Sequence, residues 1–347
     1  MYRQRIQSKL SKHGFKDKIL AWYDRHARDL PWRKSRDTYR VWVSEIMLQQ
    51  TRVAAVIEPY HEFLRRFPTI QKLAAARESS VLAAWSGLGY YRRARMLHAA
   101  AKLIAHGGGG RFPEIAEQWR TLPGVGRYTA AAIASIAFGE AVAVVDGNVE
   151  RVLQRVAGKA LSGKQVWELA DTLLDRERPG DFNQAMMELG ATVCTPRGPA
   201  CLTCPVMQMC VSRGELSGAE KSVRQKKREI HYALDRRKGT VFLVQRPKDT
   251  RLMAGMWELP EISKPQNRAE PLFRVKHSIT VTDYAVNIWP LSAPPGVPGE
   301  WRTIERLSRL ALTGLARKVL RRTGIFPASR RARGSSRVGG RASASID

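Results

Sequence analysis

A glycine turn, Leu122-Pro123-Gly124-Val125-Gly126-Arg127-Tyr128-Thr129, lies between two segments of helical periodicity and sets the expected architecture. Glycine has no Cβ, so Gly124 and Gly126 allow a tight turn and a close approach of the backbone to a ligand. The helix after the turn begins with unpaired N–H groups and a partial positive charge, which together bind a phosphate. A G-x-G sequence alone is usually only a turn, so the rest of the chain has to support this interpretation.

The sequence on both sides of the turn is helical. Apolar residues recur at three- and four-residue spacing from about residue 17 to 157, and strands are scarce there. Prolines at positions 31, 59, 68, 113 and 123 lie at or near the ends of these segments, as in short connections between helices. We therefore expect a mainly α-helical domain over residues 1–212, with the glycine turn at about 122–130.

The pattern changes after residue 212. Residues 213–229 are polar and basic without an apolar period, which predicts a linker. Residues 230–325 carry runs and alternations of β-branched and aromatic residues and close with a helical segment, which predicts a smaller α+β domain. Residues 326–347 are rich in Ser, Arg, Gly and Ala, and we expect a disordered basic tail.

The net charge limits the class of partner. The 59 lysines and arginines exceed the 31 aspartates and glutamates by 28, and such an excess favours nucleic acid as the partner. The N-terminal sequence lacks the apolar core of a signal peptide, and no apolar run of about 18 residues occurs. We therefore expect no membrane partner and a cytoplasmic protein, associated with the nucleoid if the source is a bacterium.

The only four cysteines, Cys194, Cys201, Cys204 and Cys210, lie in one 17-residue window with the spacing C-x6-C-x2-C-x5-C. Thiolates this close in sequence converge on one centre at little cost in loop closure, and that centre is either a four-thiolate zinc or a [4Fe-4S] cluster. Two disulfides are the alternative, which an intracellular location disfavours. Zinc ribbons usually show two C-x2-C pairs and this chain has one, so iron is favoured.

Three motifs together resemble the endonuclease III superfamily of base-excision enzymes over about residues 17–212: the glycine turn, Val145-Asp146-Gly147-Asn148 and the cysteine spacing. The resemblance implies a helix-hairpin-helix fold and a [4Fe-4S] cluster. Leu30-Pro31-Trp32-Arg33, Ser44-Glu45-Ile46-Met47-Leu48-Gln49-Gln50-Thr51 and Gly87-Leu88-Gly89-Tyr90-Tyr91 are similar to the adenine-excising MutY branch. This branch acts on double-stranded DNA that contains A:8-oxoguanine or A:G mispairs.

Tyr128 separates the two branches. In the bifunctional endonuclease III branch a lysine stands here and attacks the sugar as a Schiff-base nucleophile, which a phenol cannot do. Breaking the N-glycosidic bond then needs an acid for the leaving base and a negative charge for the cationic sugar. Glu45 lies in an apolar helical stretch, where burial raises a carboxyl pKa. The resemblance assigns Glu45 the acid and Asp146 the sugar cation, with Asn148 and Tyr128 nearby.

The resemblance also implies DNA contacts. A base inside a duplex has to be flipped out, and side chains commonly fill the gap. Gln50 and Tyr90 match the family's gap fillers, with ordinary packing on a helix surface as the alternative. Backbone and side-chain contacts to DNA phosphates are expected from Gly124, Gly126, Arg127, Arg33 and Arg197.

The C-terminal half contains Ala254-Gly255-Met256-Trp257-Glu258-Leu259-Pro260, which resembles the Nudix-like module with which the MutY family reads 8-oxoguanine. The metal-binding box of Nudix hydrolases is absent from the sequence, so this half should bind and not hydrolyse. Ile279-Thr280-Val281 stands where the family usually has Phe-Ser-His, which leaves His277 and Ser278 as the polar contacts.

The resemblance therefore implies a monomeric, monofunctional adenine DNA glycosylase of base-excision repair. One alternative is an endonuclease III-like glycosylase/lyase for oxidised pyrimidines, and Tyr128 argues against it. The other is a catalytically silent DNA-binding protein, and the presence of both Glu45 and Asp146 argues against that.

Because Tyr128 replaces the Schiff-base lysine, we expect the protein to leave an intact abasic strand. Borohydride added during turnover should trap no protein–DNA adduct at normal yield, as measured by denaturing gel electrophoresis beside a lysine-bearing endonuclease III-type enzyme. Stoichiometric trapping at another lysine would refute this expectation.

Overall fold

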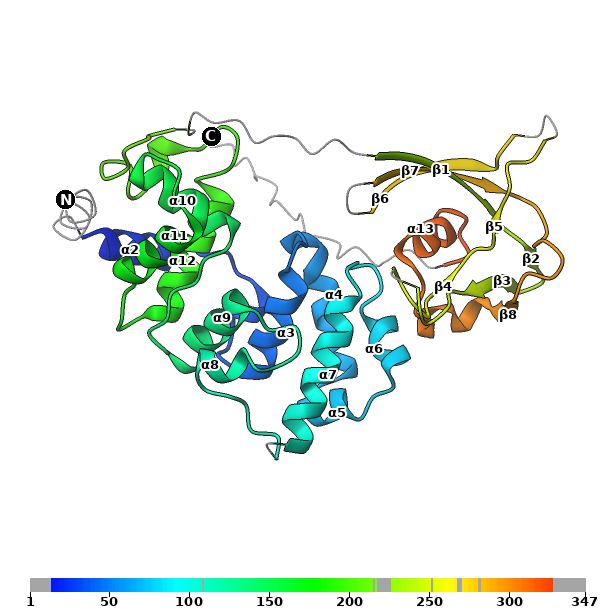
Figure 1. Cartoon of the computed structure of the whole chain (residues 1–347), viewed down its shortest axis with the longest axis horizontal. Coiled ribbons are helices and arrows are strands. Elements are labelled where there is room, and N and C mark those ends of the chain that lie inside the picture. The colour runs from blue at the N-terminus through cyan, green and yellow to red at the C-terminus, as the bar shows by residue number, and fades with distance from the viewer. Residues whose placement is uncertain are drawn as a thin grey trace, which may run out of the picture.

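The computed structural model describes residues 14–107, 109–214, 216, 226–250, 252–266, 270–279 and 282–326. A helical part precedes a β-rich part along the chain, and Figure 1 shows them as two bodies side by side. This architecture confirms the predicted fold class. Among the described helices, none combines the length and apolar character needed to cross a bilayer.

The helical part has two hydrophobic cores. The bounds of its helices are Phe15–His26 (α2), Thr38–Leu48 (α3), Val53–Arg66 (α4), Ile70–Ala74 (α5), Glu78–Ala84 (α6), Arg92–Gly107 (α7), Ala116–Trp119 (α8), Arg127–Phe138 (α9), Gly147–Ala157 (α10), Gly163–Leu173 (α11) and Pro179–Thr192 (α12), with 3-10 turns at Pro31–Arg33 (η1) and Cys201–Thr203 (η2). The first core lies among α3 to α9, around the fully buried Trp42, Trp85 and Trp119. The second lies among α2, α10, α11 and α12.

Helices α9 and α12 form the seam between the two cores. A Cβ at Gly180 of α12 would lie 2.5 Å from the Ser135 carbonyl oxygen of α9, so only glycine allows this crossing. Asn183 is buried in the seam, where its amide donates to Ser135 Oγ at 3.0 Å and to the Val142 carbonyl at 2.9 Å. A satisfied buried amide fixes one arrangement of its neighbours, because an unpaired polar group in the core is costly.

The predicted hairpin joins α8 to α9. Gly124 has a φ of +77°, and a Cβ there would lie 2.5 Å from Met96 Cβ, so both the backbone and the space require glycine. Gly126 is the N-cap of α9 and offers no capping side chain. The first N–H groups of α9 therefore lack a side-chain partner at the cap, as the phosphate-binding interpretation requires.

Two small sheets and one helix form the β-rich part. Its elements are β1 (Lys226–Ala233), β2 (Arg236–Arg237), β3 (Thr240–Gln245), β4 (Trp257–Glu258), β5 (Glu261–Ile262), β6 (Phe273–Ile279), β7 (Thr282–Trp289), β8 (Gly299–Thr303), a 3-10 turn (Ile304–Arg309, η3) and α13 (Gly314–Arg322). One sheet has the order β5-β1-β7-β6; the other has the order β2-β3-β4, with β8 on β3. Apolar residues of both sheets and of α13 share a third core.

Strand β1 begins inside the segment predicted as a linker. Residues 226–229 are exposed and charged, so their sequence shows no apolar period, yet they pair in parallel with β7 from Thr282 to Ala285. Backbone pairing does not need apolar side chains, which is why the sequence pattern missed it. Most of the remaining linker and the tail after residue 326 lie outside the described residues.

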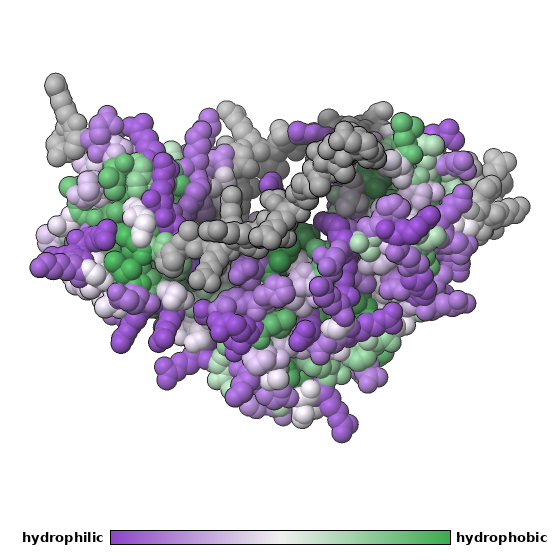
Figure 2. Space-filling model, turned by 180° about the vertical axis from the view of Figure 1, so that it is seen from behind, coloured by the Kyte–Doolittle hydropathy of each residue, from purple (hydrophilic) through white to green (hydrophobic). Residues whose placement is uncertain are grey.

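The helical part and the β-rich part are in direct contact. Met256 and Ala311 of the β-rich part are buried in the first helical core. Ser86 Oγ and the Tyr91 hydroxyl both donate to the Leu312 carbonyl, at 3.0 and 3.2 Å. Figure 2, seen from behind, shows mainly hydrophilic residues over the visible described surface, with apolar residues in smaller patches.

Candidate active site

Glu45 lies on α3 with only 6% of its surface exposed. The Tyr128 hydroxyl donates to Glu45 Oε2 at 2.9 Å. Burial raises the pKa of Glu45 to about 7, the hydrogen bond from Tyr128 opposes this, and the charge of Asp146 adds to it. A buried carboxyl of this kind holds a proton near neutral pH, which is the property of a general acid.

Tyr128 connects the two sides of the seam. Its hydroxyl lies 3.3 Å from the sulfur of Met187 on α12 as well as against Glu45. Burial, followed by the charge of Glu45, raises the pKa of Tyr128 well above its ordinary value, so the phenol keeps its proton. One phenolic proton serves one acceptor at a time. Glu45 therefore accepts from Tyr128 when ionised, and can donate to the phenol oxygen when protonated.

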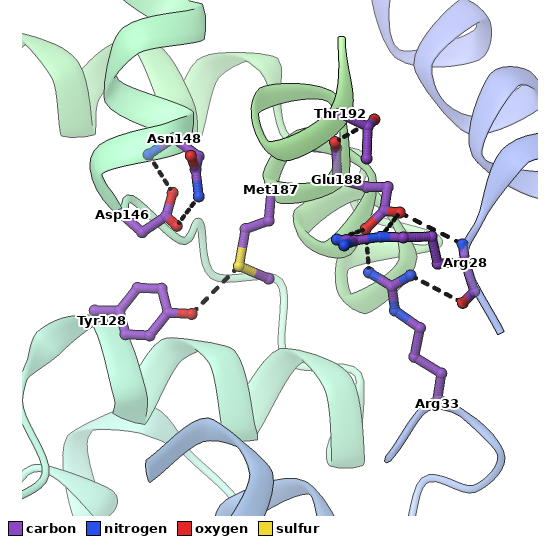
Figure 3. A network of polar contacts seen from close by, with 8 residues as sticks. All are labelled: Arg28, Arg33, Tyr128, Asp146, Asn148, Met187, Glu188 and Thr192. Atoms are coloured by element: carbon purple, nitrogen blue, oxygen red, sulfur yellow. Dashed lines mark hydrogen bonds and ion pairs between the residues drawn. The ribbon is translucent and has the colours of Figure 1, made fainter. Parts of the chain in front are cut away.

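Asp146 is the N-cap of α10. Its Oδ1 accepts from the backbone N–H groups of Asn148 at 2.9 Å and Val149 at 2.7 Å, and its Oδ2 accepts from the Asn148 side chain at 3.0 Å. These bonds and the helix N-terminus stabilise the negative charge and fix its position. Figure 3 shows Asp146, Tyr128 and Met187 in one neighbourhood, with Asn148 hydrogen-bonded to the carboxylate.

A second buried carboxylate, Glu188, lies one residue beyond Met187. Arg28 binds it through Nε at 2.5 Å and Nη2 at 2.8 Å, and Arg33 binds it through Nη2 at 2.8 Å (Figure 3). Glu188 is 1% exposed. Burial alone would raise the pKa of Glu188, but the hydrogen bonds and charges of the two arginines outweigh it and lower that pKa. Glu188 therefore stays ionised.

The sequence reasoning missed Arg28 and Glu188, which lie 160 positions apart. Arg33 was predicted to contact DNA, and the structure places it in this ion-pair network, 14% exposed as a side chain. One sequence feature could have predicted a cationic partner for Glu188: it is a glutamate in the otherwise apolar end of α12. An unpaired charge buried there would be costly.

Arg151 links Asp146 and its neighbours to the cysteine segment. Its Nη2 donates to Asn148 Oδ1 at 2.8 Å and to the Gly190 carbonyl at 2.7 Å, and its Nε donates to the Cys194 carbonyl at 2.8 Å. A Cβ at Gly190 would lie 2.7 Å from Asn148 Cβ, so glycine is required for this close approach. The start of α10 and the cysteine segment are thus held together.

The four predicted metal ligands line one small cavity. Arg155 donates to Cys194 Sγ at 3.3 Å and to the Thr195 carbonyl at 2.7 Å. Burial raises the pKa of Cys204 to about 11, and the charges of the other three cysteines add to this. In the described ranges, no three His, Cys, Asp or Glu side chains converge as ligands of a single metal ion.

Gln50 and Tyr90, predicted from the sequence to fill the gap in the duplex, lie on one cavity between the two parts of the chain, with a volume of about 1030 Å³. Both have left-handed backbones, with φ of 53° and 47°, and Tyr90 is 47% exposed. His277, Ser278 and Gly124 line the same cavity.

Arg127 and Arg197 lie apart from this cavity, whereas Ser278 and His277 on it have contacts within the β-rich part. The Arg127 guanidinium stacks on the ring of Trp167 at 3.7 Å, and Arg197 is exposed on the cysteine segment. Ser278 Oγ donates to Asp283 Oδ1 at 2.5 Å, while burial and the charge of Lys318 lower the pKa of His277. The side chain of residue 279 and all of residues 280–281 are not among those described.

Comparison with known proteins places the chain among DNA repair proteins. Residues 43–170 match the HhH-GPD superfamily of base excision DNA repair proteins. The adenine DNA glycosylase of Mus musculus is 37% identical, over 89% of this chain and 77% of the mouse protein. The adenine DNA glycosylase of Homo sapiens is 52% identical, over 58% of this chain and 39% of the human protein.

Solved structures show the same helical fold. A thermostable thymine-DNA glycosylase has 31% identity and a TM-score of 0.56, and covers 61% of this chain and 99% of its own. An endonuclease III in a non-covalent complex with DNA has 22% identity and a TM-score of 0.52, and covers 59% of this chain and 96% of its own. Because the mouse relative is matched over most of its length, the chain belongs to the adenine DNA glycosylase family, a group of base-excision DNA repair enzymes.

Proposed function

We propose that this chain is a monomeric, monofunctional glycosylase that removes adenine opposite 8-oxoguanine or guanine in double-stranded DNA. The observation that carries the proposal is the pair of unlike carboxyls at the seam. Glu45 is buried and its pKa is raised to about 7, whereas the Asp146 side chain is held at the N-terminus of α10 by backbone N–H groups. The adenine DNA glycosylases that resemble the chain support the choice of base.

The reaction follows from these two roles. Glu45 gives its proton to a ring nitrogen of the adenine, and the electron pair of the N-glycosidic bond leaves with the base. Asp146 stabilises the cationic sugar that remains, as expected for an oxocarbenium-like transition state. A water then adds to the sugar carbon, and Glu45 takes the proton that this water loses. Tyr128 holds the Glu45 carboxyl in place and forms no bond to the sugar.

We propose that the Arg28–Glu188–Arg33 network is a fixed support beside the acid. Three hydrogen bonds from the arginine side chains and one from the Arg28 backbone N–H, at 3.4 Å, occupy the acceptor sites of the Glu188 carboxylate. Since Glu188 follows Met187, which touches Tyr128, this ion-pair network lies beside Glu45.

We propose the β-rich part as the reader of the opposite base. His277 and Ser278 reach the cavity that Gln50 and Tyr90 line, which supports a role on the same stretch of duplex. The catalytic groups all come from the helical part. The β-rich part should therefore affect which mispair is chosen more than how the bond is broken.

We propose that a [4Fe-4S] cluster binds to Cys194, Cys201, Cys204 and Cys210. The four thiols line one small cavity, and four thiolates are the ligand set of such a cluster. Bound iron would also stabilise thiolates whose mutual charge raises the Cys204 pKa. The cluster would supply structural stability to the segment that Arg151 ties to α10.

The raised Glu45 pKa predicts the pH dependence of excision. The acid is active only when protonated, so kcat/KM should be constant below pH 7 and fall about tenfold per pH unit above it. Single-turnover rates of adenine release between pH 5.5 and 9 measure this decrease. Glu45→Gln should lower the rate by roughly 10²- to 10⁴-fold and abolish its decrease above pH 7, with duplex affinity near wild type. If the variant kept the same decrease with pH, the acid would be another residue.

The choice of substrate is tested with labelled duplexes that carry A opposite 8-oxoguanine, A opposite guanine, or thymine glycol. We expect release of adenine from the first two and no reaction with the third. Release of thymine glycol without adenine release would support the pyrimidine-specific alternative. Duplex binding without any release would support the silent DNA-binding protein.

Protein purified without oxygen should be brown and contain about four irons and four sulfides per chain. Cys204→Ser should lower the iron content and weaken duplex binding, because the segment loses its metal. Lys159→Ala, a charge change on the surface near this segment, is the matched control and should keep its iron. Colourless protein with one zinc per chain would contradict the cluster.

A further inference from the structure

Arg93 lies in the first turn of α7 and joins two segments that are distant in sequence. Its Nη1 donates to the carbonyls of Ile46 at 2.9 Å and Met47 at 3.0 Å, and also to the carbonyl of Gln49. Helix α3 ends at Leu48, and its last carbonyls have no partner within the helix. A guanidinium at this position satisfies them and complements the negative end of the helix that carries Glu45.

The other side of the same guanidinium holds the loop that precedes α7. Nη2 donates to the Leu88 and Gly89 carbonyls, both at 3.3 Å, and to Thr51 Oγ1 at 3.1 Å. The guanidinium also lies 5.3 Å from the centre of the Tyr90 ring. One side chain therefore spans the gap between residues 46–51 and residues 88–90.

Both held segments carry a strained residue. Gln50 and Tyr90 are two of the four described non-glycine residues with positive φ, and each lies directly beside a carbonyl that Arg93 binds. A non-glycine residue keeps a left-handed backbone conformation only where neighbouring contacts stabilise it. The hydrogen bonds of Arg93 supply such contacts next to both Gln50 and Tyr90.

We propose that Arg93 is the positioning residue for base extrusion, because it fixes Gln50 and Tyr90 relative to each other so that both enter the duplex together. This inference rests on the proposed function only in taking the two side chains as gap fillers. Arg93 touches neither the base nor the sugar in this role. It acts through the two segments that it joins.

Lysine cannot replace arginine here. In the planar guanidinium, Nη1 binds carbonyls at the end of α3 while Nη2 bridges Thr51 to the Leu88 and Gly89 carbonyls, whereas an ammonium is a single point with no fixed fork. The third nitrogen of the guanidinium, Nε, is buried with no partner among the described residues. Nη1 and Nη2 therefore make all of the hydrogen bonds that join the two segments. A conservative change should therefore lose most of the function.

The test measures base extrusion apart from bond breaking. A duplex with 2-aminopurine in place of the target adenine is titrated with Glu45→Gln protein, in which excision is blocked, and the fluorescence rise on unstacking is recorded. Adding Arg93→Lys or Arg93→Ala should remove most of this rise, while duplex affinity stays within about threefold. Lys102→Ala removes an exposed charge from the same helix and should leave the rise intact.

A double-mutant cycle then shows whether Arg93 acts through the gap fillers. In the Glu45-intact protein, Arg93→Lys should slow single-turnover adenine release by roughly tenfold to a hundredfold, the scale of a misplacement near 1 Å. In a Tyr90→Ala, Gln50→Ala background the same change should cost less than about threefold, because its targets are gone. Full additivity, or wild-type fluorescence in Arg93→Lys, would overturn the proposal.

The two proposals fail in distinguishable ways. If wild-type protein releases no adenine, the proposed function fails, yet the fluorescence titration still reports whether Arg93 controls extrusion. If Arg93→Ala does not fold, as judged by thermal unfolding, Arg93→Lys carries the test, since it keeps the charge and most of the stem.

Discussion

The burial of Glu45 at the seam of two helical cores is the constraint on which the rest of the site depends. The acid belongs to α3 and the first core, whereas Asp146 caps α10 and belongs to the second. Their separation is thus set by how α9 crosses α12. Gly180 permits that crossing and Asn183 fixes it, so these two residues of α12 help to set the separation of the two proposed catalytic carboxyls.

Burial does not decide by itself what a carboxyl does. Glu45 and Glu188 are both almost fully buried, yet the pKa of Glu45 is raised to about 7 and the pKa of Glu188 is lowered. Glu45 accepts one hydrogen bond from a neutral phenol, whereas two guanidinium groups bind Glu188. The partners therefore leave one carboxyl with a pKa near neutral and hold the other as an anion.

Local features could be predicted from the sequence, and long-range polar pairs could not. The glycine turn, the helical segments and the clustering of the four cysteines depend on neighbours in the chain; the structure has helices on both sides of the turn and the four cysteines on one cavity. The partners of Glu188 and of Arg93 depend on which helices meet, so no spacing in the sequence predicts them. The strand at Lys226 was missed because its charged residues are placed by backbone pairing.

The β-rich part is built into the helical part at the segment that carries Tyr90. Arg93 holds that segment from one side, and Ser86 and Tyr91 bind the Leu312 carbonyl on the other. Met256 and Ala311 complete the first helical core, so separating the two parts would expose apolar surface beside the same segment. The β-rich part, proposed as the reader of the opposite base, and Tyr90, proposed as a gap filler, therefore share one support, so a change at this segment should affect mispair recognition and adenine extrusion together.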